Sequence, residues 1–213
     1  NYSVVINFHG ERTILVHHVP RQYTWNIQEP PKWFYLTSMG EGFEPIYDKV
    51  IEVMRQGNIF LAYNPGTHQL KKGLEFLRPS LTVTTILFLN REESAELLGL
   101  ADHPAIMQLL EELKKLGPQI VVITDGPKGS YVFDGNEVYQ MGIYDGPVIE
   151  RTGAGDAYST AFTVAMAEGK TIPEAMMWAP INSMSVVQHV GAQKGLLSRE
   201  KLEEFLQNAP VEY

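Results

Sequence analysis

A run of small residues that ends in a carboxylate is the strongest chemical signal in this 213-residue sequence. The run, TGAGD at residues 152–156, leads directly into an apolar-periodic segment over residues 157–168. Glycines let successive backbone N–H groups converge, and a helix N-terminus adds partial positive charge, so the run predicts an anion-binding site. Asp156 could accept the proton of a substrate hydroxyl while the amides stabilise a transferring phosphoryl group, as in a small-molecule kinase. The simpler alternative is that Asp156 caps the helix.

Two further segments contain residue types that could bind magnesium or phosphate. NREE at residues 90–93 follows an apolar strand candidate, and Mg²⁺ prefers such carboxylates, often through water. TDGPKG at residues 124–129 follows a second apolar strand, at the end of a sheet where α/β proteins bind their ligands. Each segment also has a structural interpretation. The first is typical of a helix cap with acidic residues near the helix dipole, and the second of a hairpin loop with glycines at positive φ.

Residues 150–158, ERTGAGDAY, resemble the C-terminal signature of the ribokinase-like (PfkB) carbohydrate kinase family. In that family the aspartate of the G-A-G-D sequence is the catalytic base, and the amides before it form the anion hole. The resemblance therefore implies that Asp156 is the base. It implies that Gly153, Ala154 and Gly155 form the anion hole.

The other two segments resemble further motifs of the same family. Asn90 and Glu93 match its N-x-x-E motif, which organises magnesium and phosphate. The segment TDGPKG resembles its T-x-G-x-x-G nucleotide loop. By this resemblance, the residues that line the phosphates and ribose of the nucleotide are Thr124, Gly126 and Gly129, with Lys128 as a further phosphate contact.

Residues 179–192 resemble the family helix and loop that wall the adenine pocket, and Asn182 is the predicted lining residue there. An asparagine within an apolar helix is more often packed and hydrogen-bonded than in contact with a ligand, so this alternative stays open. Some family members bind a monovalent cation beside the anion hole, and Glu150 falls at that place. The resemblance thus implies ATP and Mg²⁺, with K⁺ as a further ion.

The elements that must position these motifs alternate between strand and helix patterns. Repeated βα units predict an α/β fold with a mainly parallel sheet and helices on both faces. Turn signals predict a hairpin at the start of the chain and a second one, at a sheet edge, over residues 130–140. We expect one ribokinase-like domain over residues 1–213, with a lid-like hairpin over residues 1–20. The expected strands are residues 2–8, 12–16, 33–36, 59–63, 85–89, 120–124, 130–133 and 137–140, and the expected helices are residues 44–56, 105–116, 156–168, 172–190 and 199–207.

The composition excludes several other classes of protein. Apolar residues make up 44% and charged residues 20% of the chain, which is typical of a folded globular protein. The net charge of -8 opposes binding to nucleic acid or anionic lipid, and no apolar run approaches the roughly 20 residues that span a bilayer. The chain has no cysteine, and therefore no disulfide framework or thiolate nucleophile. We expect a cytoplasmic protein with no nucleic-acid or membrane partner.

The resemblance covers the central and C-terminal parts of the family fold but not its front. Family members begin with strands that carry a diglycine signature and residues that hold the sugar hydroxyls, whereas nothing here precedes the lid-like hairpin. We therefore expect these residues alone to bind ATP weakly and to phosphorylate poorly or not at all. Exposed sheet edges favour association, so we also expect a homodimer through the lid or such an edge.

The function predicted on this basis is transfer of the γ-phosphoryl group of ATP to a hydroxyl of a sugar or sugar-like molecule. Two alternatives remain open. One is a nucleoside kinase of the adenosine type, which the sequence does not separate from a sugar kinase. The other is a non-catalytic, nucleotide-binding remnant of the fold.

Overall fold

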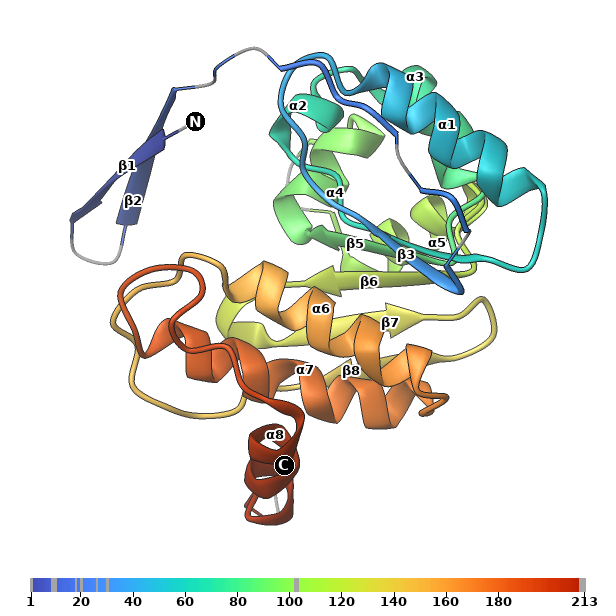
Figure 1. Cartoon of the computed structure of the whole chain (residues 1–213). Coiled ribbons are helices and arrows are strands. Elements are labelled where there is room, and N and C mark those ends of the chain that lie inside the picture. Colours follow the sequence, from blue (N-terminus) through green and yellow to red (C-terminus); the bar gives the residue numbers. More distant parts are fainter. Residues whose placement is uncertain are drawn as a thin grey trace.

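The computed structural model describes residues 2–8, 11–17, 19, 21–25, 27–29, 31–101 and 104–210. Figure 1 shows a layered body and an N-terminal hairpin that stands apart from it. In chain order the elements are β1 (Tyr2–Phe8), β2 (Glu11–His17), β3 (Trp33–Leu36), α1 (Glu44–Arg55), β4 (Phe60–Tyr63), α2 (Thr67–Leu70), α3 (Leu74–Leu81), β5 (Ile86–Asn90), α4 (Arg91–Leu98), α5 (Ile106–Lys115), β6 (Ile120–Thr124), a 3₁₀ turn (Gly126–Lys128), β7 (Ser130–Phe133), β8 (Val138–Met141), α6 (Ala154–Ala167), α7 (Ile172–Val187) and α8 (Arg199–Gln207).

Six strands form the central sheet in the order β3-β4-β5-β6-β7-β8. The strands from β3 to β6 are parallel, and β7 and β8 continue the sheet in antiparallel pairing. This confirms the predicted mainly parallel sheet with a hairpin at its edge. The pairing of β5 with β6 sets Asn90 opposite Thr124. Two of the predicted motifs therefore begin at the carboxyl ends of neighbouring strands.

Helices on both faces of the sheet explain why its central strands are almost wholly apolar. Successive residues of a strand point to opposite faces. In β5, Leu87 and Leu89 belong to the core formed with α1, α3, α4 and α5, whereas Ile86 and Phe88 belong to the core formed with α6 and α7. Figure 1 shows these two helix groups on opposite sides of the strands. Burial of both faces is typical of parallel sheets.

The structure corrects the bounds of two predicted helices and adds two helices that were not predicted. The helix α7 ends at Val187, before the predicted end at residue 190, because the Val187 carbonyl accepts hydrogen bonds from the N–H groups of Ile149 and Glu150. The helix α6 begins at Ala154, two residues earlier than predicted. Two helices, α2 and α3, lie where none was predicted. Both helices are short, which leaves little periodicity in the sequence, and Pro79 interrupts the helical pattern of α3.

The N-terminal hairpin pairs β1 with β2 in antiparallel fashion. This confirms the predicted hairpin, although residues 1, 9, 10, 18 and 20 of the expected range 1–20 lie outside the described residues. Its apolar side chains are not covered by the body of the protein. Those of Val4, Val5, Ile6, Ile14 and Leu15 are 38% to 55% exposed.

Candidate functional site

The three sequence motifs meet at the carboxyl edge of the parallel strands. A cavity of about 380 Å³ is lined by residues of the 124–129 loop and by Ala154 and Gly155 at the start of α6. The third motif, residues 90–93, starts next to Thr124 through the β5–β6 pairing. The fold thus assembles in one place three segments that are separate in the sequence.

The N-terminus of α6 has the backbone that an anion hole requires. Gly153 is its N-cap residue, with φ +84° and ψ −1°, in the left-handed region that favours glycine. A Cβ on Gly153 would lie 2.7 Å from the Cβ of Ala192, so the neighbouring loop also leaves no room for a side chain. The first N–H groups of a helix have no partner within the helix and bind anions readily. Ala154 and Gly155 present this end of α6 to the cavity.

Asp156 lies in the first turn of α6, and its side chain is exposed. Gly153 occupies the N-cap position, so Asp156 is not the N-cap residue but lies in the first helical turn, where a carboxylate still favours the helix dipole. The side-chain amide of Asn64 donates to Asp156 Oδ1 at 3.4 Å and to the Tyr35 hydroxyl oxygen at 3.2 Å. Burial raises the pKa of Tyr35, and the negative charge of Asp156 also contributes to this rise. Asp156 is therefore an exposed carboxylate that is oriented by a neutral polar neighbour.

Asn64 and Tyr35 lie outside the motifs that predicted the site from the sequence. Asn64 directly follows the apolar strand β4, just as Asp125 follows β6, and polar residues at such positions face the ligand edge of an α/β sheet. That signal was present in the sequence. Tyr35 has no such signal, because an aromatic residue within a strand is typical of packing.

Asn90 and Glu93 form a reciprocal capping box at the start of α4. The Glu93 N–H donates to Asn90 Oδ1 at 2.7 Å, and the Asn90 N–H donates to Glu93 Oε2 at 2.9 Å. The helix-cap interpretation of this motif is therefore confirmed. Burial raises the pKa of Glu93, and the negative charges of Glu92, Glu96 and Asp156 add to this rise. Burial is thus the main reason that the capping carboxyl holds its proton more tightly.

The raised pKa of Glu93 predicts a pH dependence of stability. The folded chain holds the Glu93 proton more tightly than the unfolded chain does, so Glu93 favours folding most below its ordinary pKa of 4.5. This contribution is lost as the pH rises through the raised, folded-state pKa. Urea unfolding at a series of pH values should show that the wild type loses free energy of unfolding relative to Glu93→Gln over that window. A difference between the two proteins that is independent of pH would contradict the assignment.

The predicted nucleotide loop is the turn between β6 and β7. The N–H of Asp125 donates to the Gly129 carbonyl at 2.8 Å, which confirms the hairpin-loop interpretation. Gly129 has φ +88°, and a Cβ there would collide with the Met141 carbonyl oxygen. Thr124, Gly126 and Gly129 all line the cavity. The exposed Lys128 holds its Nζ 3.8 Å from Asp125 Oδ2.

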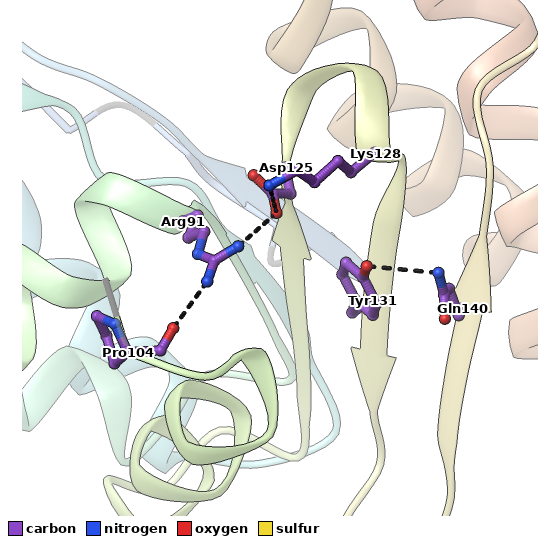
Figure 2. Close-up of polar contacts among 6 residues, drawn as sticks. All are labelled: Arg91, Pro104, Asp125, Lys128, Tyr131 and Gln140. Carbon is purple, nitrogen blue, oxygen red and sulfur yellow. Dashed lines mark hydrogen bonds and ion pairs between the residues drawn. The ribbon is translucent and has the colours of Figure 1, made fainter. Parts of the chain in front are cut away.

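An ion pair joins this loop to the start of α4. Arg91 Nη1 donates to Asp125 Oδ2 at 2.8 Å, and Arg91 Nη2 donates to the Pro104 carbonyl at 2.9 Å (Figure 2). Neither charged residue was predicted from the sequence to have a role in the site. Arg91 and Asp125 each come one residue after the paired positions Asn90 and Thr124, so only the strand order reveals that they meet.

The rest of the cavity wall is mostly apolar. It comes from the segment after β8 and from α7, with Ile143, Tyr144, Val148, Met184 and Val187 among its residues. A cavity with an apolar wall and a polar end of loop amides suits a ligand that has a flat apolar part and an anionic part.

The predicted lining residue Asn182 takes a different place. It is 5% exposed, its amide donates to the Ala157 carbonyl at 2.9 Å, and its oxygen accepts from the Leu197 N–H at 3.1 Å. The α7 residues that line the cavity are instead Pro180, Ser183, Met184 and Val187. Asn182 thus joins α7 to α6 and to the segment before α8, as packed asparagines in helices do.

Glu150 connects the segment before the anion hole to the loop after α7. Its Oε1 accepts from the Thr152 hydroxyl at 2.5 Å, and its Oε2 accepts from the Gly191 N–H at 2.9 Å. Among the described residues, no group of three or more His, Asp or Glu side chains is arranged to hold a metal ion. The monovalent-cation role of Glu150 and the magnesium role of Asn90 and Glu93 therefore stay predictions.

Comparison with protein families matches residues 17–199 to the pfkB family carbohydrate kinase. The chain is 34% identical over 125 residues to a ribokinase of Arabidopsis thaliana, which covers 57% of this chain and 33% of that protein. It is 28% identical over 152 residues to a nucleoside kinase of Methanocaldococcus jannaschii, which covers 71% and 48% of the two chains.

Solved structures agree with these relatives in fold. The structure of Arabidopsis thaliana ribokinase complexed with ribose and ATP superposes with a TM-score of 0.71 at 26% identity, over 83% of this chain and 56% of that chain. The Burkholderia thailandensis nucleoside kinase in complex with inosine has the same TM-score at 20% identity, over 85% and 58%. The matched part of this chain thus spans about half or less of the curated relatives.

Proposed function

Because the chain belongs to the pfkB family of carbohydrate kinases, we propose that it supplies the nucleotide-binding and catalytic part of an ATP-dependent kinase for a sugar or nucleoside hydroxyl. The observation that supports this most is the exposed Asp156 in the first turn of α6, beside the glycine-rich start of that helix and the 124–129 loop. A base, an anion site and a cavity for a nucleotide therefore share one edge of the sheet.

In this proposal Asp156 accepts the proton of the acceptor hydroxyl. The hydroxyl oxygen forms a bond to the γ-phosphorus of ATP, and the bond from that phosphorus to the bridging oxygen breaks, which leaves ADP. The N–H groups that follow Gly153 stabilise the charge on the transferring phosphoryl oxygens. Asn64 keeps the carboxylate of Asp156 turned toward the carboxyl edge of the sheet through its 3.4 Å hydrogen bond.

The residues around the cavity fit a nucleotide. A base would contact the apolar wall from Tyr144 to Met184, and the phosphates would reach the amides of the 124–129 loop and of α6. Asn90 and Glu93, which meet in the capping box at the start of α4, are the proposed magnesium site, since oxygen ligands and carboxylates above all are what Mg²⁺ prefers. When bound, Mg²⁺ would neutralise phosphate charge. A potassium ion near Glu150 is the remaining part of the proposal.

The acceptor class is tested by measuring ADP release from ATP with a panel of sugars and nucleosides, using the full protein. We expect turnover that depends on one class of acceptor. A protein that binds ATP but gives no acceptor-dependent ADP with any compound would support the alternative, a non-catalytic nucleotide-binding domain. The hydrolysis of ATP without acceptor serves as the baseline for each assay.

The exposed apolar hairpin supports a further part of the proposal, a homodimer through β1 and β2. Apolar side chains that are this exposed on a two-stranded hairpin are typical of an interaction surface. We expect the wild type to sediment as a dimer in analytical ultracentrifugation and Leu15→Lys to sediment as a monomer. Met107→Lys, which alters an exposed apolar residue of α5, is the control and should leave the dimer intact. A monomeric wild type would contradict this assembly.

The proposed location is the cytoplasm, and the proposed partners are a small-molecule acceptor and ATP, with no nucleic acid or membrane. The net charge of -8 supports the exclusion of polyanions. In the part of the chain that the structure describes, no helix is long and apolar enough to cross a bilayer.

A further inference from the structure

The ion pair between Arg91 and Asp125 lies directly behind the proposed phosphate loop. Both side chains are largely buried, with 22% and 12% exposure. The two terminal nitrogens of Arg91 donate hydrogen bonds to Asp125 and to the Pro104 carbonyl, and Figure 2 shows the guanidinium between these two acceptors. Its Nε is buried without a hydrogen-bond partner among the described residues.

A contribution to the stability of the fold does not explain this ion pair well. A buried ion pair often contributes no more than an apolar pair of similar volume, since both charges must be removed from water. The unpartnered Nε of Arg91 adds a further desolvation cost. A role in ligand binding would account for a pair that stability alone does not favour.

Asp125 presents an electrostatic problem for a loop that binds phosphate. It stands between Thr124 and Gly126, which both line the cavity, so an unpaired carboxylate there would repel an anionic ligand. It would also attract Lys128, whose Nζ is already 3.8 Å from the same Oδ2 atom. Figure 2 shows Lys128 and Arg91 approaching this carboxylate from different sides.

We propose that Arg91 is a positioning residue for the nucleotide phosphates: by offsetting the charge of Asp125, it weakens the attraction of that carboxylate for Lys128, 3.8 Å away, and its repulsion of the anion. Arg91 acts through Asp125, because among the described residues the cavity wall includes Thr124 and Gly126 but neither Arg91 nor Asp125. This inference rests on the proposed function, since it takes the cavity to be the ATP site.

The test is the dissociation constant for ATP, measured by calorimetry on the full protein and three variants. Arg91→Met should weaken binding about tenfold, which is the scale of one uncompensated charge near the phosphates. Asp125→Asn should bind at least as tightly as the wild type. The double variant Arg91→Met with Asp125→Asn should return to within about threefold of the wild type, because the charge balance is restored. Arg78→Met, which removes an exposed arginine paired with Glu75, is the control.

Salt separates this role from a structural one. Raising the salt concentration from about 0.1 M to about 1 M shortens the Debye length from about 10 Å to about 3 Å, so the deficit of Arg91→Met should shrink. If Arg91→Met does not fold, Asp125→Asn and the double variant still give the comparison, and Arg91→Lys should bind ATP nearly as the wild type does.

The outcomes that overturn the inference differ from those that overturn the proposed function. A wild type that does not bind ATP rejects both. If the wild type binds ATP but the double variant binds it about tenfold more weakly, as Arg91→Met does, only the inference is rejected. Lost charge balance would then not be the cause of the weaker binding. Equal binding by the wild type and Arg91→Met rejects it as well.

Discussion

Replacing Asp156 with asparagine is expected to lower the rate of acceptor phosphorylation about 10²- to 10⁴-fold, which is the usual contribution of a general base. The amide has the shape of the carboxylate, and its oxygen can still accept the hydrogen bond that Asn64 donates to Asp156. The structure of the site and its affinity for ATP should therefore stay close to those of the wild type. What is lost is the group that removes the hydroxyl proton.

Asp48→Asn is the matched control for this change, because Asp48 is an exposed aspartate on α1, in the layer on the other face of the sheet. The measurement is ADP release with saturating ATP and acceptor, together with the dissociation constant for ATP. Unchanged turnover in Asp156→Asn would remove Asp156 from the role of base. Lost ATP affinity at unchanged turnover per bound nucleotide would instead make it a binding residue.

Gly153→Ala is expected to have the second largest effect, on both stability and ATP binding. The left-handed conformation costs an alanine about 1–2 kcal/mol. The new Cβ would also lie 2.7 Å from the Ala192 Cβ and 2.9 Å from the Ala192 carbonyl oxygen, and such crowding typically adds about 1–3 kcal/mol. To relieve it, the start of α6 must move, and the amides of the proposed anion hole would move with it.

Gly169→Ala separates the two causes. Gly169 follows α6 at its other end and has φ +83°, almost the same as Gly153, but a Cβ there meets nothing within 4 Å. Its alanine variant should therefore lose about 1–2 kcal/mol of unfolding free energy in urea and keep its ATP affinity. If the two variants lose equal stability and bind ATP alike, the contact between Gly153 and Ala192 has no role in the site.

The sequence predicted the central strands well because residues 86–89 and 120–123 are continuous apolar runs. Such runs are expected where helices cover both faces of a sheet. The sequence predicted α6, although two residues short of its observed start, and it predicted the two loops, because glycines and polar residues that follow a strand are local signals. It missed α3, where Pro79 interrupts the pattern, and it assigned Asn182 to the cavity although that side chain is held by two backbone groups.

The missed site residues have a common physical reason. Asn64 meets Asp156, and Arg91 meets Asp125, only because particular strands are neighbours in the sheet. One sequence contains no direct record of strand order. A polar residue that directly follows a strand can be predicted to lie in the site. The residue that it contacts there is known only once the order of the strands in the sheet is known.

The distance along the chain between these partners has a consequence for how the site forms. The 124–129 loop closes within a single hairpin, whereas the hydrogen bond from Asn64 to Asp156 joins residues 92 positions apart. Closing such a long segment carries a large entropy loss, which only contacts formed elsewhere in the fold can offset. We therefore expect the 124–129 turn to form early in folding. We expect the contact that orients the Asp156 carboxylate to form late, once both layers have docked on the sheet.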